Sequence, residues 1–235
     1  MIRANTFPAL LIAIVAVAVL FATAVWAKPF AEARIIFEVN ATDGDAGIQV
    51  FLDAEPWKLV TITGPTGQIF EVEAKGTLQG FGLTELFSES NEPPFETVPL
   101  QDVLDLFPAG KYEFKGTTVK GTDLKTSVTL SHTLPCGPVI LSPAILPAGA
   151  ATIEWAAVTN ELDHATGECG VLTDLEIAGY QVIVGDFQVT LPAEATSVTV
   201  PPQFLEPNTL YLFEVLAIEA NGNQTITESS FTTTP

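Results

Sequence analysis

The sequence predicts an all-β protein: two antiparallel β-sandwiches in tandem, preceded by an N-terminal hydrophobic leader helix. Apolar residues alternate with a period of two in many short segments, which is typical of half-buried strands. Proline and glycine signals separate these segments, and a longer Pro- and Gly-rich stretch divides the chain near its middle. A length of 235 residues suits two small domains, and a hydrophobic content of 47% argues against disorder.

The first 27 residues have the layout of a secretory signal peptide. The run "ALLIAIVAVAVLFATAVWA", from position 9 to Ala27, contains no charge, Arg3 precedes it, and small residues at Val25 and Ala27 offer a cleavage site. The alternative is an uncleaved anchor, because the run is long enough to span a bilayer. Both interpretations place the rest of the chain outside the cytoplasm, as a secreted, periplasmic or cell-surface protein.

Residues 28–135 are predicted to form the first sandwich. Alternating segments include "RIIFEVN", "GIQVFLD", "KLVTIT", "QIFEVEAKG", "KYEFKGTTV" and "TSVTLSHTL". One segment breaks this pattern: "PLQDVLDLF", positions 99–107, has apolar residues at helical spacing and predicts a short helix with an inward apolar stripe. In pattern alone, this half of the chain resembles Ig-like sandwiches.

The stretch "TLPCGPVILSPAILPAGAA" marks the boundary, and residues 136–235 are predicted to form the second sandwich. Two segments, "LDLFPAGKYEF" and "QFLEPNTLYLF", both place a proline four residues before a tyrosine. In sandwich domains such a tyrosine hydrogen-bonds back over the preceding turn, as a tyrosine corner. Tyr112 and Tyr211 are therefore predicted corners, although an ordinary buried tyrosine is the alternative for each.

Residues from about Pro138 to the C-terminus resemble a fibronectin type III domain. Trp155 in "IEWAAV" matches the core tryptophan of the family's second strand, and "IAGYQVIV", with Tyr180, matches the third strand. The turn before the sixth strand is matched by Leu205, Pro207, Thr209 and Tyr211. The resemblance implies a binding or spacer role. The insertion "TNELDHATGECGVLTDLE" departs from the family, and an Arg-containing receptor-binding loop is not carried over, because no Arg follows Arg34.

The charge excludes some partners. The formal net charge is −19, so binding to nucleic acid is not expected, and anionic lipid should repel the chain as a whole. A membrane is therefore expected as a partner only through an uncleaved leader. No Lys or Arg follows Lys125, whereas twelve acidic residues do.

Two cysteines in an exported chain favour a disulfide. Cys136 lies in "LPCGP" at the domain boundary and Cys169 in the inserted segment, so a bond would staple the insertion to the linker. The alternatives are two free thiols or an intermolecular bond.

Metal binding is a weaker hypothesis. In "NATDGDAG", Asp43 and Asp45 offer two carboxylates to Ca²⁺ in a glycine-rich turn, but Ca²⁺ takes six to eight ligands, and the same letters fit a plain hairpin turn. No other cofactor is expected. The acidic insertion matches no zinc motif and is interpreted as a solvated loop.

One strand predicts a partner surface. If the alternate residues from Tyr211 onward point inward, their neighbours point outward and are mostly apolar. The predicted surface consists of Ile183, Leu210, Leu212, Leu216 and Ile218. Its occupant is left open between the N-terminal domain, a second copy in a homo-oligomer, and a separate protein, and scattered apolar exposure is the alternative.

The sequence therefore predicts an exported, non-catalytic interaction or spacer protein. No nucleophile, nucleotide-binding or metalloprotease motif is present, so an enzyme is not expected. The alternatives are a calcium-dependent adhesion or carbohydrate-binding module, and an accessory subunit of an extracellular enzyme. "NAT" at Asn40 and "NQT" at Asn223 are N-glycosylation sequons.

Overall fold

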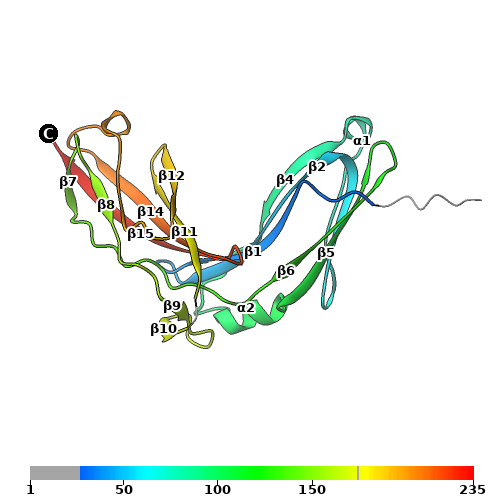
Figure 1. The fold of residues 1–235 in the computed structure, drawn as a ribbon, viewed down its shortest axis with the longest axis horizontal. Coiled ribbons are helices and arrows are strands. Elements are labelled where there is room, and N and C mark those ends of the chain that lie inside the picture. The colour runs from blue at the N-terminus through cyan, green and yellow to red at the C-terminus, as the bar shows by residue number, and fades with distance from the viewer. Residues whose placement is uncertain (1–26, 174) are drawn as a thin grey trace, which may run out of the picture.

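The computed structural model describes residues 27–173 and 175–235, and it is an all-β structure, as the sequence predicts. Two β-sandwich units lie along one long axis (Figure 1). The leader prediction falls on residues 1–26 and so lies outside the described residues. Among the residues described, no helix is long and apolar enough to cross a membrane.

The N-terminal unit is built around one long strand that pairs with four other strands. β2 (Asp45–Gly64) pairs through its first half with β1 (Glu32–Asn40) and β4 (Leu83–Glu89), and through its second half with β3 (Gly67–Glu73) and β5 (Gly110–Thr118). A register shift between Asp53 and Trp57 separates the halves. Such a bulge bends a strand, so the two halves of β2 can run in different directions within the sheet.

β6 (Asp123–Leu130) pairs with β5 and completes this unit. The buried residues alternate along the strands, because successive side chains point to opposite faces. Its largest core residues, each under 2% exposed, are Phe37, Leu52, Trp57, Ile62, Leu100, Leu104, Tyr112 and Phe114.

Two helices interrupt these strands. α2 (Leu100–Leu106) confirms the helix predicted over 99–107, and it buries Leu100, Val103 and Leu104. α1 (Thr77–Phe81) was not predicted, and none of its residues is buried. Gly76, which precedes it, has φ 55°, a left-handed conformation that favours glycine.

The C-terminal unit is a two-sheet, Ig-like sandwich. One sheet has the order β12 (Phe187–Pro192), β11 (Ile177–Val184), β14 (Leu210–Glu219) and β15 (Gln224–Thr234). The other pairs β8 (Thr152–Glu154) with β13 (Ser197–Thr199). The remaining elements are β7 (Ile145–Pro147), β9 (Asn160–Leu162), β10 (Cys169–Leu172) and the 3₁₀ helix η1 (Pro202–Phe204).

The predicted core residues of this unit lie between its sheets. Trp155 and Tyr180 are each 1% exposed, and their rings are 5.4 Å apart. Tyr180 Oη also accepts a hydrogen bond from the Val158 N–H at 2.9 Å. Both aromatic side chains therefore contribute to the core rather than to an open site.

The two predicted corner tyrosines both hydrogen-bond back over the preceding turn. Tyr112 Oη donates to the Pro108 carbonyl at 3.1 Å, and Tyr211 Oη accepts from the Glu206 N–H at 2.7 Å. Gly64 packs directly against the Tyr112 ring, where an added Cβ would lie 2.4 Å from a ring carbon.

Candidate functional site: the joint between the two units

The two sandwich units share one continuous sheet. β1 of the first unit pairs in parallel with β15 of the second, with Glu38, Val39 and Asn40 opposite Gln224, Thr225 and Ile226. Through this pairing the sheet has the order β12-β11-β14-β15-β1-β2-β5-β6. Figure 1 shows β1 meeting β15 where the two units join, so the main-chain hydrogen bonding of one unit continues into the other.

A buried asparagine fastens this joint. Asn223, 1% exposed, lies just before β15. Its Oδ1 accepts a hydrogen bond from the Phe37 N–H at 2.9 Å, and its Nδ2 donates to the carbonyls of Ser131 and Thr133, both at 2.9 Å. One side chain thus ties β15, β1 and the linker after β6. A glycan on this Nδ2 is incompatible with these contacts, so the Asn223 sequon is blocked in the folded chain.

The linker after β6 is also held by β15 and by the turn that precedes it. Thr225, fully buried, donates its hydroxyl to the Pro135 carbonyl at 2.6 Å. Asn221 Nδ2 donates to the Thr133 carbonyl at 3.1 Å. Gly137 allows the close approach that follows, because an added Cβ would lie 2.5 Å from Thr227 Oγ1 and 2.7 Å from the Ala41 Cβ.

The inserted segment acts as a strap across the joint. Its β9 pairs with β10, and the Leu162 N–H donates to the Leu134 carbonyl at 3.0 Å. Leu162 is 4% exposed and belongs to the core of the N-terminal unit, although the insertion comes from the C-terminal half. The insertion is therefore not simply the solvated acidic loop that its composition predicts, because one of its apolar side chains fills the neighbouring core.

The disulfide closes this strap. Cys136 and Cys169 are bonded, with Cα atoms 5.3 Å apart, which confirms the predicted pairing. Beyond it, an added Cβ on Gly167 would lie 2.7 Å from the Phe95 ring, so the tip of the insertion touches the N-terminal unit. The His164 ring meets the His132 ring edge to face, with centroids 6.3 Å apart.

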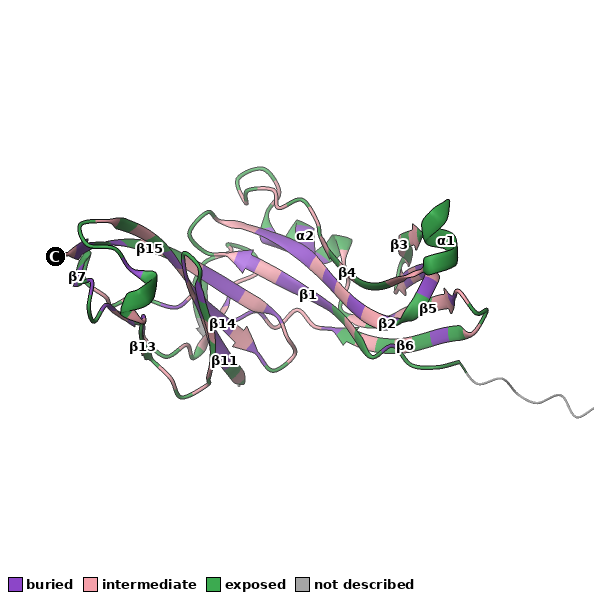
Figure 2. Ribbon diagram, turned by 90° about the horizontal axis from the view of Figure 1, so that it is seen from above, coloured by how far each residue is buried: buried purple, intermediate pink, exposed green. Residues whose placement is uncertain are grey.

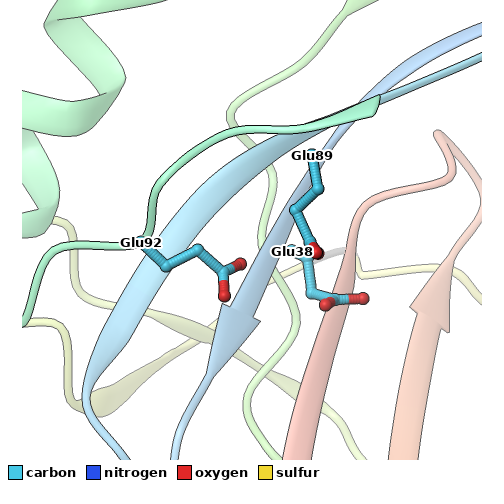
Figure 3. A group of neighbouring side chains, drawn as sticks. All are labelled: Glu38, Glu89 and Glu92. Atoms are coloured by element: carbon cyan, nitrogen blue, oxygen red, sulfur yellow. The ribbon is translucent and has the colours of Figure 1, made fainter. Parts of the chain in front are cut away.

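Three carboxylates converge on the outer face of the joint. Ligand oxygens of Glu38 in β1, Glu89 in β4 and Glu92 after β4 all lie within 4.8 Å of one another (Figure 3). Glu38 accepts a hydrogen bond from Gln224 across the joint, and Glu89 accepts one from Gln49 at 2.8 Å. Three carboxylates are hard oxygen ligands of the kind that Ca²⁺ and Mg²⁺ take, though fewer than Ca²⁺ requires.

Crowding changes the protonation of this cluster. Burial, followed by the charges of Glu89, Glu38 and Asp45, raises the pKa of Glu92 to about 7. Burial also raises the pKa of Glu38, against the hydrogen bond from Gln224, which lowers it. Because burial and neighbouring like charges disfavour ionisation, Glu38 and Glu92 hold their protons more tightly than separate glutamates would.

The predicted calcium pair lies next to this cluster but is not part of it. Asp43 and Asp45 are in the β1–β2 turn, where Asn40 Oδ1 accepts hydrogen bonds from the N–H groups of Thr42 and Asp43. Gly44 has φ 68° and donates to the Asn40 carbonyl at 2.8 Å. This is the hairpin turn that was the alternative interpretation. Burial, followed by the charges of Asp43 and Glu228, raises the pKa of Asp45.

The predicted partner surface is only partly exposed. Leu210 and Leu212 are 64% and 74% exposed on the outer face of β14, and Ile183 and Ile218 are half-buried. Leu216 is 3% exposed, so its place on an open surface was wrong. It lies in register between Gln181 of β11 and Ile226 of β15, towards the end of β14 that meets the joint.

A shallow hollow borders the exposed part of this surface. It has a volume of about 260 Å³, and Ile183, Leu212, Glu214 and Glu228 line it. Burial raises the pKa of Glu214, and the charge of Glu228 raises it further. The surface therefore combines two apolar side chains with an acidic rim.

Sequence reasoning missed the residues that make the joint. Asn223 looked like one letter of the turn "EANGNQT", and the three glutamates were hidden among 28 acidic residues. Asn223 and Thr225, at the start of β15, are followed by the apolar Ile226. Such a mixture of polar and apolar residues is only a weak signal for buried polar contacts. No local pattern could have paired β15 with β1, because 186 residues separate Glu38 from Gln224.

The chain is similar to known proteins in structure but not in sequence. No family model matches the chain, and no curated protein matches it in sequence. A structure of Clostridium thermocellum CbhA fibronectin(III)-like modules is similar at 10% identity, covering 91% of each chain, with a TM-score of 0.33. Chicken CNTN1 FN1-FN3 domains are similar at 13% identity, covering 89% of this chain and 68% of that one, with a TM-score of 0.28.

The chain spans a smaller share of other similar structures. It covers 28% of the Clostridium perfringens spore cortex lytic enzyme SleM, which covers 43% of this chain at 18% identity and a TM-score of 0.29. A structure from a 1.5-MDa bacterial ice-binding adhesin is similar at 16% identity, with a TM-score of 0.28. The match covers 88% of this chain and 65% of that one. At TM-scores this low, the similarities carry no conclusion about what this chain does.

Proposed function

We propose that the chain is an exported, non-catalytic spacer and interaction protein whose two sandwich units form one rigid body. The observation that carries this proposal is the joint, where β1 and β15 continue one sheet from unit to unit. Units that meet only through a small polar interface normally move relative to each other. Here a strand ladder, a buried asparagine and a disulfide-closed strap all cross the boundary.

Rigidity is the property that a spacer requires. A spacer sets the distance between two other molecules only if its own two ends keep a fixed distance and orientation. A hinge between the units would let both vary. The strap explains why the insertion exists in an exported module: it adds a covalent closure that does not depend on the strand ladder.

Two further observations support export and the module type. A disulfide persists in oxidising compartments, which agrees with a leader that directs the chain out of the cytoplasm. The C-terminal unit combines a five-stranded and a two-stranded sheet around Trp155 and Tyr180, with a corner tyrosine at Tyr211, and this supports a fibronectin type III-like module.

The interaction part of the proposal concerns the outer face of β14. Leu210 and Leu212 project from the unit that lies farther from the start of the described chain, with the half-buried Ile183 beside them. A rigid body would present this face at a fixed distance to a partner protein. A second copy of the chain and a separate protein both fit the apolar surface.

Distance measurements between spin labels test the rigid spacer. Labels on Lys120→Cys and Glu194→Cys, both exposed, lie in different units. We expect one narrow distance distribution in the parent chain and a broader one when Asn223→Ala is added. Asn91→Ala, an exposed asparagine in a loop, is the matched control and should leave the distribution narrow. A broad or multimodal distribution in the parent chain would refute the proposal.

A further inference from the structure

The described chain begins at the end of the molecule that carries α1. The Lys28 N–H donates to the Asp123 carbonyl at 2.9 Å, so Ala27 lies beside the β5–β6 turn. Gly82, the residue after α1, lies close to the same turn and to β2, because an added Cβ on it would lie 2.8 Å from a Val119 methyl and 2.9 Å from the Pro56 Cβ. Figure 1 shows these segments together at one end and the C-terminus at the other.

This end exposes large apolar side chains. Phe81 is 77% exposed and Leu78 is 50% exposed, and the whole segment from position 75 to position 81 is exposed (Figure 2). A helix of five residues that buries nothing gains no stability from packing. Apolar side chains clustered in this way on a protruding tip indicate contact with another surface.

The basic residues of the chain gather at the same end. Lys28 and Lys120 line a hollow of about 390 Å³ beside Glu55, and Lys115 and Lys125 line a second hollow of about 320 Å³ beside Ala27. Lys75 lies two residues before α1, and the Lys58 carbonyl accepts a hydrogen bond from the Ala74 N–H just before it. Six of the eight basic residues in the described part of the chain therefore lie here, whereas the C-terminal unit has none.

Acidic neighbours balance part of this charge. Lys28 pairs with Glu55 at 2.7 Å, and Lys115 and Lys125 pair with Glu113 at 2.9 and 3.1 Å. Lys75 pairs with Glu73, and Asp123 lines the same hollow as Lys115 and Lys125. Lys120 is exposed in the β5–β6 turn and makes no ion pair with any described residue. This lysine is therefore available to an anion outside the protein.

We propose that this end of the molecule rests on an anionic lipid bilayer, with Phe81 and Leu78 inserted among the headgroups and the lysines against the phosphates. We choose a lipid bilayer as the partner of this end because of the sequence that leads up to Ala27. An uncharged apolar run occupies positions 9–27, so a bilayer that holds this run lies within a residue or two of the tip. The inference rests on the proposed export of the chain.

The geometry reconciles this contact with a net charge of −19. The acidic C-terminal unit lies at the opposite end of the long axis (Figure 1), and charges separated by more than a Debye length of about 10 Å are largely screened. A chain standing on this lysine-bearing end keeps its acidic C-terminal unit away from the lipid. In this orientation the outer face of β14 would lie in the unit that is farther from the membrane.

Vesicle flotation tests the proposal without the apolar run. The chain beginning at Lys28 retains every residue of both cores, since the first core residue is Phe30, and its melting curve checks that it folds. The probes are vesicles of phosphatidylglycerol and phosphatidylcholine in equal parts, and vesicles of phosphatidylcholine alone. We expect flotation with the anionic vesicles that weakens with added salt.

Two substitutions at the tip separate the contributions. Phe81→Ser should lower partitioning about tenfold, because it removes apolar area from the inserted surface. Lys120→Glu should lower partitioning about tenfold on anionic vesicles only. Leu212→Ser and Lys111→Glu are matched controls, because Leu212 is 74% exposed in the other unit and Lys111 begins β5, away from its turn with β6.

Each outcome decides the proposal. Equal flotation of Phe81→Ser and the parent chain would overturn it, as would no flotation of the parent chain or an equal loss in Leu212→Ser. None of the tip side chains packs in either core, so melting temperatures should stay unchanged. A narrow spin-label distribution combined with failed flotation would leave the rigid spacer standing and remove only the membrane contact.

Discussion

Replacing Asn223 by alanine removes three hydrogen bonds from the joint without touching either hydrophobic core. The Phe37 N–H, in a residue that is fully buried, loses the acceptor on Asn223, and the Ser131 carbonyl loses its donor. The Thr133 carbonyl still receives a hydrogen bond from Asn221 Nδ2. Two main-chain groups are therefore left without these partners.

The expected cost follows from these two groups. A buried polar group left without a partner costs about 1–3 kcal/mol, so with two such groups Asn223→Ala should lower the free energy of unfolding by about 2–6 kcal/mol. At about 2–4 °C per kcal/mol for a chain of this size, that corresponds to a melting temperature lower by about 4–24 °C. Urea unfolding followed by tryptophan fluorescence measures the first quantity, and calorimetry measures the second.

A matched variant makes the result decisive. Asn91→Ala removes the same amide from an exposed loop and should change the free energy of unfolding by less than about 0.5 kcal/mol. If Asn223→Ala unfolds within about 0.5 kcal/mol of the parent chain, the asparagine does not fasten the joint. Equal losses in the two variants would contradict the account in the same way.

Three further predictions concern other parts of the account. Replacing Cys136 and Cys169 together by serine should lower the free energy of unfolding by about 3–4 kcal/mol, because the bond spans a sequence separation of 33, and a loss below about 1 kcal/mol in urea unfolding would contradict it. Because the pKa of Glu92 is raised in the folded chain, this group contributes stability that is fully present below pH 4.5 and is lost as pH rises through about 7, by about 1 kcal/mol after solvent screening. Glu92→Gln should therefore make the fall in stability from about pH 5 to 8 less steep, and an unchanged slope in unfolding curves over that range would show that another group is responsible. Tyr211→Phe should cost about 1 kcal/mol in the same unfolding assay, because the Glu206 N–H loses its acceptor, and no measurable change would mean that water replaces the hydroxyl.

The strands, α2 and the disulfide could be predicted from sequence because each depends on local or compartmental signals. Period-two alternation fixes which residues of a strand face the core, and the spacing of Leu100, Val103 and Leu104 fixes the buried stripe of α2. The corner hydrogen bond of Tyr211 could be predicted because its donor, the Glu206 N–H, lies only five residues earlier in the chain.

The joint could not be predicted, because it depends on contacts between distant segments. The side-chain pattern of β15 shows which face is buried but does not identify the strand at its free edge. Leu216 fails for the same reason: alternation puts it on the outer face, but its own segment does not show that this end of β14 lies at the joint, where its partner Ile226 pairs with Asn40 of β1. α1 was missed because five residues with no buried stripe leave no periodic signal.

The most direct test of the account is whether the two units tumble as one body. Backbone ¹⁵N relaxation of the chain beginning at Lys28 gives a rotational diffusion tensor for each unit separately. The shared sheet and the disulfide-closed strap predict that a single tensor fits the strands of both units, from β1 to β15. Two different tensors, or correlation times close to those of separate small domains, would contradict a rigid joint and the spacer role that depends on it.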